Sequence, residues 1–285
     1  MQKSVPTVVW KGLVISGIIV QLCLLIRIQN WFFTGIDIYD KKYVGFHLNH
    51  GRLGNQLFHL VTGYGIARTL GRKHYFPNER HKDYVLNYLQ RITKVFPLLE
   101  QTYVFAPVLV NQTVVRFANS CCVYENPLRL STNNARYLLL DFYFGQNPRY
   151  FQNYMADVRK LLRFSNDYRR EGNYLIDLLR MVTEIFAWLG VFEVLLGDSF
   201  GKVCVTIQLT KAVLISKFDE YMDLYVSSQL CRSFLISAVT STFGWWLAFF
   251  AYGQNAIYYM PDERIQVDKV PDGELFLKTW QQYKG

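Results

Sequence analysis

The sequence lacks the patterns that identify several common classes of protein. Its lysines and arginines outnumber its acidic residues and give a net charge of +9, but they are scattered, with no run of five or more basic residues. No zinc-finger, RNA-binding or basic-zipper pattern occurs, so the charge does not predict a nucleic-acid partner. Repeats and low-complexity tracts are also absent, and 51% of the residues are hydrophobic, which excludes a disordered chain.

Cysteine is scarce, and its spacing does not suit a metal site. Five cysteines occur in 285 residues, none of them in a Cys-x-x-Cys pattern, so a zinc site is not expected. The four that follow the N-terminal apolar run are Cys121, Cys122, Cys204 and Cys231. Four cysteines allow three sets of disulfides, and buried free thiols are the alternative.

One long apolar run is present near the N-terminus, between Gly12 and Ile26. Lys11 and Arg27 flank it and tryptophans lie just outside it, so the span can reach about 17 to 20 residues. We interpret it as a transmembrane helix. A cleaved signal peptide and a buried core helix are the alternatives, although the residues that follow offer no convincing small-x-small cleavage site.

A single span divides the chain only once, and a weak bias in the flanking positive charges favours a cytoplasmic N-terminus. Residues 1–10 are then a cytoplasmic tail, residues 11–30 the signal anchor and residues 31–42 a stem. The remainder is lumenal, where the Asn-x-Thr sequon at Asn111 is a candidate glycosylation site. A chance match is the alternative for this sequon.

Beyond residue 42, strand-like runs alternate with helix-like runs. Residues 43–48 are typical of a strand and end in a glycine-rich loop. From Asn55 onward apolar residues recur at helical spacing, and Gly71 fits just past the end of that helix. Further strands are predicted at residues 136–144, 191–198, 202–209 and the first half of 233–243. This alternation favours an α/β fold with parallel sheets.

The loop from Gly51 to Asn55 has the composition of a polar ligand site. Gly51 and Gly54 permit positive φ and close approach of another molecule to the main chain. The helix that follows leaves N–H groups unpaired, and these attract an anion. Arg52 and Asn55 can add directed hydrogen bonds to a phosphate or a sugar. The loop matches neither G-x-G-x-x-G nor a Walker loop, so a tight structural turn is the alternative.

Three blocks of the sequence point to one family. They are GRLGNQLF at residues 51–58, LLDFYFGQNPRYF at residues 139–151 and STFGWW at residues 241–246. In this order they resemble the alpha-1,2-fucosyltransferases, in particular the nematode branch of the family. The resemblance implies a type II Golgi membrane enzyme that transfers L-fucose from GDP-fucose to the 2-hydroxyl of a galactoside on a glycan, with inversion and without a metal or other cofactor.

The resemblance also implies a GT-B-like fold, in which two Rossmann-like lobes, residues 43–165 and 166–285, enclose the substrates. The family's H-x-R-R-G-D block, whose arginine faces the diphosphate, is missing here. Its nearest match, RREGN at residues 169–173, lacks the histidine and the aspartate. We therefore expect a truncated GDP-fucose-binding lobe and weak activity. The alternative is an inactive relative that binds a glycan or a partner protein at the Golgi membrane.

Five residues are candidates for the site by their place in these motifs. Arg52 and Asn55 are expected to line the catalytic cleft. Ser241 and Thr242 are expected to hydrogen-bond the diphosphate, and Asp198 to meet the nucleoside. The structural alternatives are a surface salt bridge for the arginine, a helix N-cap for the asparagine, a helix cap for the two hydroxyls and a turn for the aspartate.

The aromatic and histidine residues near these motifs have separate interpretations. Trp245 and Trp246 are expected to pack in the core rather than to bind sugar. His47, His50 and His59 lie near the glycine loop and include possible general bases, with an exposed or a core histidine as the alternative for each.

Overall fold

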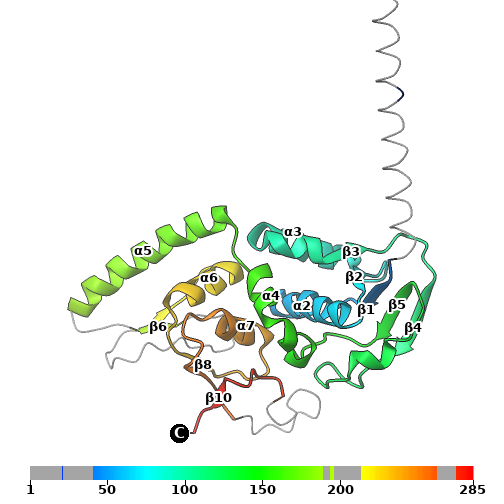
Figure 1. The fold of residues 1–285 in the computed structure, drawn as a ribbon. Helices are drawn as coiled ribbons and strands as arrows, with labels where there is room; N and C mark the ends of the chain where they lie inside the picture. The colour runs from blue at the N-terminus through cyan, green and yellow to red at the C-terminus, as the bar shows by residue number, and fades with distance from the viewer. Residues whose placement is uncertain (1–20, 22–40, 189–192, 196–212, 262–273, 285) are drawn as a thin grey trace, which may run out of the picture. The chain divides into compact units, whose positions relative to one another are not determined.

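The computed structural model describes residue 21 and residues 41–188, 193–195, 213–261 and 274–284 (Figure 1). Met1–Lys42 and Tyr43–Gly285 form separate compact units, and the elements below belong to the second. The predicted anchor, including Gly12 and Ile26, lies outside the described residues, as does the predicted strand at residues 202–209. No helix in the described part of the chain combines the length and the hydrophobicity that a bilayer span requires. The boundaries of the tail, the stem and the two lobes stay predictions.

The amino-terminal half of the second unit is built on a five-stranded parallel sheet (Figure 1). Its strands are β1 (Tyr43–Phe46), β2 (Lys73–Phe76), β3 (Tyr103–Phe105), β4 (Gln112–Arg116) and β5 (Tyr137–Asp141). Their spatial order is β3-β2-β1-β5-β4. The chain therefore builds outward from β1 in one direction and then returns to its other side. In such sheets ligands bind at the carboxyl ends of the strands where the direction changes, which here is between β1 and β5.

Helix α2 (Leu53–Thr69) follows β1 and is buried along most of its length. It contacts β1, β2 and α7, so it has a neighbour on nearly every side. Gly71 adopts φ +62° just beyond its end, where a left-handed residue without a Cβ terminates a helix, as the sequence predicted. Helix α3 (Lys82–Val95) is amphipathic instead and buries Val85, Leu89 and Ile92 on one face.

The remaining elements of this half are short until the chain reaches a long helix. Four 3-10 segments lie at Pro97–Thr102, Pro127–Leu130, Pro148–Tyr150 and Gln152–Tyr154. Helices α4 (Met155–Leu161) and α5 (Asn166–Trp188) follow the last of them.

The carboxyl-terminal half contains two small parallel sheets. One has the order β10-β9-β8, formed by β8 (Phe234–Ile236), β9 (Ile257–Tyr259) and β10 (Gln281–Gln282). The other pairs β6 (Glu193–Leu195) with β7 (Val213–Ile215). The described residues of this half also form the helices α6 (Glu220–Leu230) and α7 (Thr242–Phe250). The predicted α/β fold with parallel sheets is confirmed, and the strands predicted near residues 136–144 and 233–243 are β5 and β8.

Aromatic residues connect the two halves through the core. Trp245 and Trp246 of α7 are 4% and 0% exposed. The ring of Phe58 in α2 lies 4.9 Å from Trp245 and 5.1 Å from Trp246, and Phe151 packs against both tryptophans. The interpretation of the paired tryptophans as core residues is confirmed, and they fix α7 against α2.

Candidate functional site

The loop between β1 and α2 is held by two buried amide side chains. Asn49 Oδ1 accepts hydrogen bonds from Gly51 N at 2.9 Å and from Gln56 Nε2 at 3.2 Å. Gln56 Nε2 also lies 2.8 Å from Gly51 O. Both amides are at most 2% exposed. Because buried hydrogen bonds on both sides restrain it, the loop has its shape before any ligand binds.

The two glycines of this loop are required by packing within the chain. Neither has positive φ, so the backbone freedom that glycine permits is not used here. A Cβ on Gly51 would lie 2.1 Å from Asn55 Nδ2, and one on Gly54 would lie 2.6 Å from Phe243 N. Asn55 and α7 therefore both lie close to the main chain of these glycines, and the approach of a ligand to this loop stays a prediction.

Helices α2 and α7 begin at the same place. Trp246 Nε1 donates to Gly54 O at 2.9 Å, and Gly54 packs against Thr242 in the first turn of α7. The amino end of a helix has a partial positive charge because its first N–H groups lack helical partners. Residues 192 positions apart thus form one electropositive contact. We call it the helix junction; its residues are Gly54, Asn55, Ser241, Thr242 and Trp246.

Gln146, in the loop after β5, joins the helix junction. Its Nε2 donates to Asn55 Oδ1 at 2.6 Å. Its main-chain N–H donates to Cys121 O, and the neighbouring Asn147 donates through Nδ2 to Cys122 O, both at 2.8 Å. The sequence analysis missed Gln146 as a site residue, although it lies in the second of the three blocks.

The cysteines behind Gln146 are oxidised. Cys121 and Cys122 form a disulfide with each other, and Cys231 is disulfide-bonded as well. The alternative of free thiols is therefore wrong for these three residues. Cys204 lies outside the described residues.

The structure assigns capping positions to two of the predicted site residues. Arg52 is exposed and holds the N-cap position of α2, so the capping alternative for Asn55 is wrong. Ser241 is the N-cap of α7, where its Oγ accepts from Gly244 N at 3.2 Å, which confirms the capping alternative for this hydroxyl. Ser241 and Thr242 are half-buried, and contact between these residues and a ligand stays a prediction.

Asp198 lies outside the described residues. The remaining residues named from the sequence lie away from the helix junction. Arg169 and Arg170 hydrogen-bond Asn166 and Asp167 of their own helix, and none of their described contacts reaches the junction. Asn111 is exposed immediately before β4.

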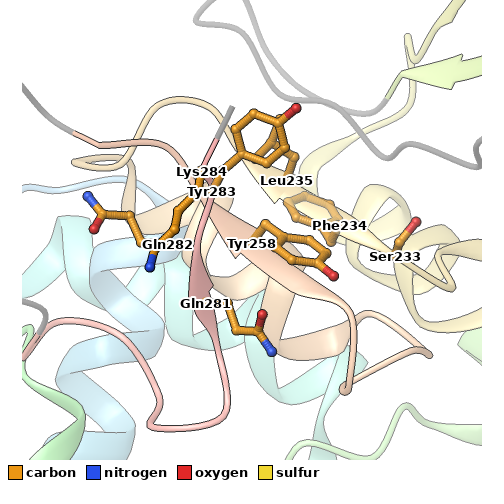
Figure 2. A pocket seen from close by; sticks show the side chains of 8 residues that line it. All are labelled: Ser233, Phe234, Leu235, Tyr258, Gln281, Gln282, Tyr283 and Lys284. Atoms are coloured by element: carbon orange, nitrogen blue, oxygen red, sulfur yellow. The ribbon is translucent and has the colours of Figure 1, made fainter.

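The helix junction encloses little space. Its cavity of about 20 Å³ is lined by Gln146, Ser241, Thr242 and their neighbours, which is room for about one water molecule. A cavity of about 500 Å³ beside Arg149 and Glu274 shares no lining residue with it. The largest of these three cavities, about 810 Å³, lies on the three-stranded sheet and also shares no lining residue with the junction cavity. Figure 2 shows this cavity, which is lined by Ser233, Phe234, Leu235, Tyr258, Gln281, Gln282, Tyr283 and Lys284.

A second polar cluster lies at the carboxyl ends of β1, β2 and β5. His47 Nδ1 lies 3.0 Å from Glu79 Oε2, and His47 Nε2 lies 3.4 Å from Asp141 Oδ1. The ring of Tyr143 stacks on His47 with centroids 4.8 Å apart. Sequence reasoning named His47 but missed its three partners. The available signal was Asp141, a charged residue that ends a strand-like run.

The other two candidate histidines differ in their surroundings. His50 is exposed, and its ring lies 5.2 Å from that of His81. His59 is fully buried against Phe46 and His74. Burial, with a smaller contribution from His74, lowers the pKa of His59 well below its usual value, and burial also lowers the pKa of His74 to about 3. His59 is therefore a neutral core histidine, as its structural alternative stated.

Comparisons with known proteins support the resemblance. A Caenorhabditis elegans protein named "Putative glycosyltransferase C06E1.7" is 27% identical over 281 residues, covering 80% of this chain and 76% of that protein. Two others from the same species are each named "Galactoside 2-alpha-L-fucosyltransferase". One is 26% identical over 272 residues, covering 80% of this chain and 76% of that protein, and the other 24% over 279 residues, covering 73% and 68%.

These relatives confirm that the chain is similar to galactoside 2-alpha-L-fucosyltransferases. No family model and no solved structure matches the chain. Among the described residues, no three His, Cys, Asp or Glu side chains are arranged to hold a metal ion.

Proposed function

We propose that the chain is a glycosyltransferase of the alpha-1,2-fucosyltransferase family, which transfers L-fucose from GDP-fucose to the 2-hydroxyl of a galactoside on a glycan. Relatives named for this reaction support the assignment. The structural observation that carries it is the hydrogen bond from Trp246 Nε1 to Gly54 O, because it unites the first and third blocks in one site.

The helix junction suits a departing diphosphate. Two helix amino ends supply fixed positive partial charge where negative charge develops as the bond to the sugar breaks. Arg52, exposed at the N-cap of α2, adds a full charge. The Ser241 hydroxyl accepts from Gly244 N and keeps its own proton for a phosphate oxygen. The reaction that the resemblance implies is a direct displacement with inversion and without a metal, and these groups can stabilise the charge that leaves in such a reaction.

We also propose that the fold is an incomplete GT-B arrangement, on a protein anchored in the Golgi membrane by residues 11–30. Complete parallel sheets in α/β proteins are covered on both faces. Leu235, Tyr258 and Gln281 form one row across the three-stranded sheet and line the cavity of about 810 Å³. Among the described residues, a sheet face that lines a cavity and a junction cavity of about 20 Å³ are what a shortened donor lobe predicts.

A second function has one observation in its favour. Arg169 and Arg170, the nearest match to the missing arginine block, hydrogen-bond within their own helix. A chain without a diphosphate arginine can retain the fold and bind a glycan or an active partner while its own catalysis is lost.

Transfer of radiolabelled fucose to a beta-galactoside by the purified full-length chain tests the proposal. Loss of one preorganised charge-stabilising group costs about 100-fold or more, so we expect turnover at least that far below an intact relative. Arg52→Ala and Ser241→Ala should lower it further, and Arg163→Ala, at an exposed arginine elsewhere, should not. GDP binding without turnover would favour the second function, and absence of both binding and turnover would refute the first.

A further inference from the structure

In the cluster of His47, Glu79 and Asp141, solvent exposure of the side chain increases from the histidine to Asp141. The side chains of His47 and Glu79 are 18% and 27% exposed, whereas that of Asp141 is 53% exposed. The Glu79 carboxylate is also held by the main chain, because its Oε1 accepts a hydrogen bond from the N–H of Leu48 at 2.6 Å. A ligand can therefore reach the Asp141 carboxylate, and the other two side chains support that carboxylate.

Tyr143 adds an apolar surface beside this carboxylate. It follows Asp141 by two residues, stacks on His47 and is 51% exposed. An exposed aromatic ring that is held in place by a second ring loses little freedom when it binds, and it offers a flat apolar face to the C–H side of a sugar ring. A carboxylate next to such a face suits a neutral sugar with a free hydroxyl group.

The cluster lies on the same rim as the helix junction. His47 directly follows β1 and Asp141 ends the neighbouring strand β5, where the sheet changes direction, the position at which ligands bind in such sheets. The loop after β5 carries both Tyr143, which stacks on His47, and Gln146, which hydrogen-bonds Asn55. One short loop thus connects the carboxylate cluster to the diphosphate side of the proposed site.

We propose that Asp141 is the catalytic base that receives the proton of the acceptor hydroxyl, that His47 and Glu79 are positioning residues for its carboxylate, and that Tyr143 stacks on the acceptor sugar. This inference rests on the proposed glycosyl transfer and assigns the acceptor half of its site.

The proton and the electrons balance in this step. The acceptor O–H proton passes to an Asp141 oxygen as the acceptor oxygen forms its bond to C1 of the transferred sugar. The bond from C1 to the diphosphate oxygen breaks, and its electron pair leaves with the nucleoside diphosphate. Protonated Asp141 can then hydrogen-bond Nε2 of His47, whose Nδ1 lies 3.0 Å from Glu79 Oε2. The exposed carboxyl returns its proton to solvent.

Asp141→Asn in the full-length chain tests the base directly. We expect the turnover of GDP-fucose with a beta-galactoside to fall about 100-fold or more, with GDP affinity unchanged. Asp157→Asn is the matched control, because its side chain is 46% exposed and pairs with Arg68 at 3.1 Å, outside the site. It should retain the turnover of the unmodified chain.

Chemical rescue separates a catalytic carboxylate from a structural one. Asp141→Gly should be inactive and should recover turnover when formate is added, because a small carboxylate can enter the vacated space. His47→Gln keeps an amide donor for Glu79 and should lower kcat by about tenfold, a positioning effect that leaves GDP affinity intact. Tyr143→Ala should raise the KM for the acceptor more than it lowers kcat.

The outcomes distinguish this inference from the function on which it rests. If the unmodified chain transfers fucose and Asp141→Asn does so equally fast, Asp141 is not the base and the proposed function stands. Turnover of Asp141→Gly that formate does not restore would also overturn the assignment. If the unmodified chain neither binds GDP nor transfers fucose, the function fails and the inference falls with it.

Discussion

Replacing Gly54 with alanine tests whether the helix junction is as tight as the structure indicates. The added Cβ would lie 2.6 Å from Phe243 N, 2.7 Å from Thr242 Oγ1 and 2.8 Å from Thr242 C. Two of these atoms belong to the main chain, so α7 itself must move. Overpacking of this kind costs about 1–3 kcal/mol, and weakening the bond from Trp246 to Gly54 O adds about 1 kcal/mol. Alanine regains up to about 1 kcal/mol through its helix propensity, so a net loss of roughly 1–3 kcal/mol is expected.

Gly244→Ala is the matched control, because Gly244 also lies in the first turn of a helix at this junction. Its Cβ would meet no atom nearer than 3.5 Å, which is ordinary contact. This variant should be unchanged or more stable by up to about 1 kcal/mol. Urea unfolding followed by tryptophan fluorescence gives both free energies of unfolding. Equal unfolding midpoints for the two variants, or a Gly54→Ala protein more stable than the unmodified chain, would refute the close packing of α2 on α7.

Two further predictions concern the buried histidines and the sequon. Burial lowers the pKa of His74 from 6.5 to about 3, so the unfolded chain gains a proton below pH 6.5 that the folded chain does not. The stability that is present above pH 6.5 is therefore lost as the pH falls toward 3, by about 2 kcal/mol for His74 between pH 7 and pH 5. His74→Phe should reduce this slope in urea unfolding at the two pH values, and an unchanged slope would contradict the assignment. Exposed Asn111 should carry one glycan when the full chain is made in animal cells, seen as a gel shift that Asn111→Gln removes. A chain that shows no such shift would count against a lumenal position.

The local parts of the fold were predictable because they depend on short-range patterns. Helix α2 follows from apolar spacing after Asn55 and from Gly71 at its end, and β5 follows from a run of apolar residues that ends in Asp141. The start of α2 at Leu53 was missed by two residues, because Arg52 caps it through its main-chain conformation and makes no side-chain cap bond.

The site was less predictable because its contacts join distant parts of the chain. The resemblance selected Asn55 and Ser241, but nothing near either residue indicates that Gln146 hydrogen-bonds the first. The packing of Gly54 was missed for the same reason, since the group that excludes a Cβ there is the main chain of α7. The cluster around His47 depends on β1 and β5 being neighbours, which follows from the strand order and from no local pattern.

The bond from Trp246 to Gly54 has a consequence for the order in which the protein is made. All strands of the five-stranded sheet are contained in residues 43–141, so this sheet can assemble while the rest of the chain is still being synthesised. The helix junction requires closure of a loop of 192 residues and must wait until α7 has emerged from the ribosome. A nascent chain therefore possesses a folded sheet well before it possesses the helix junction, and a chain that stops before residue 240 never acquires this junction.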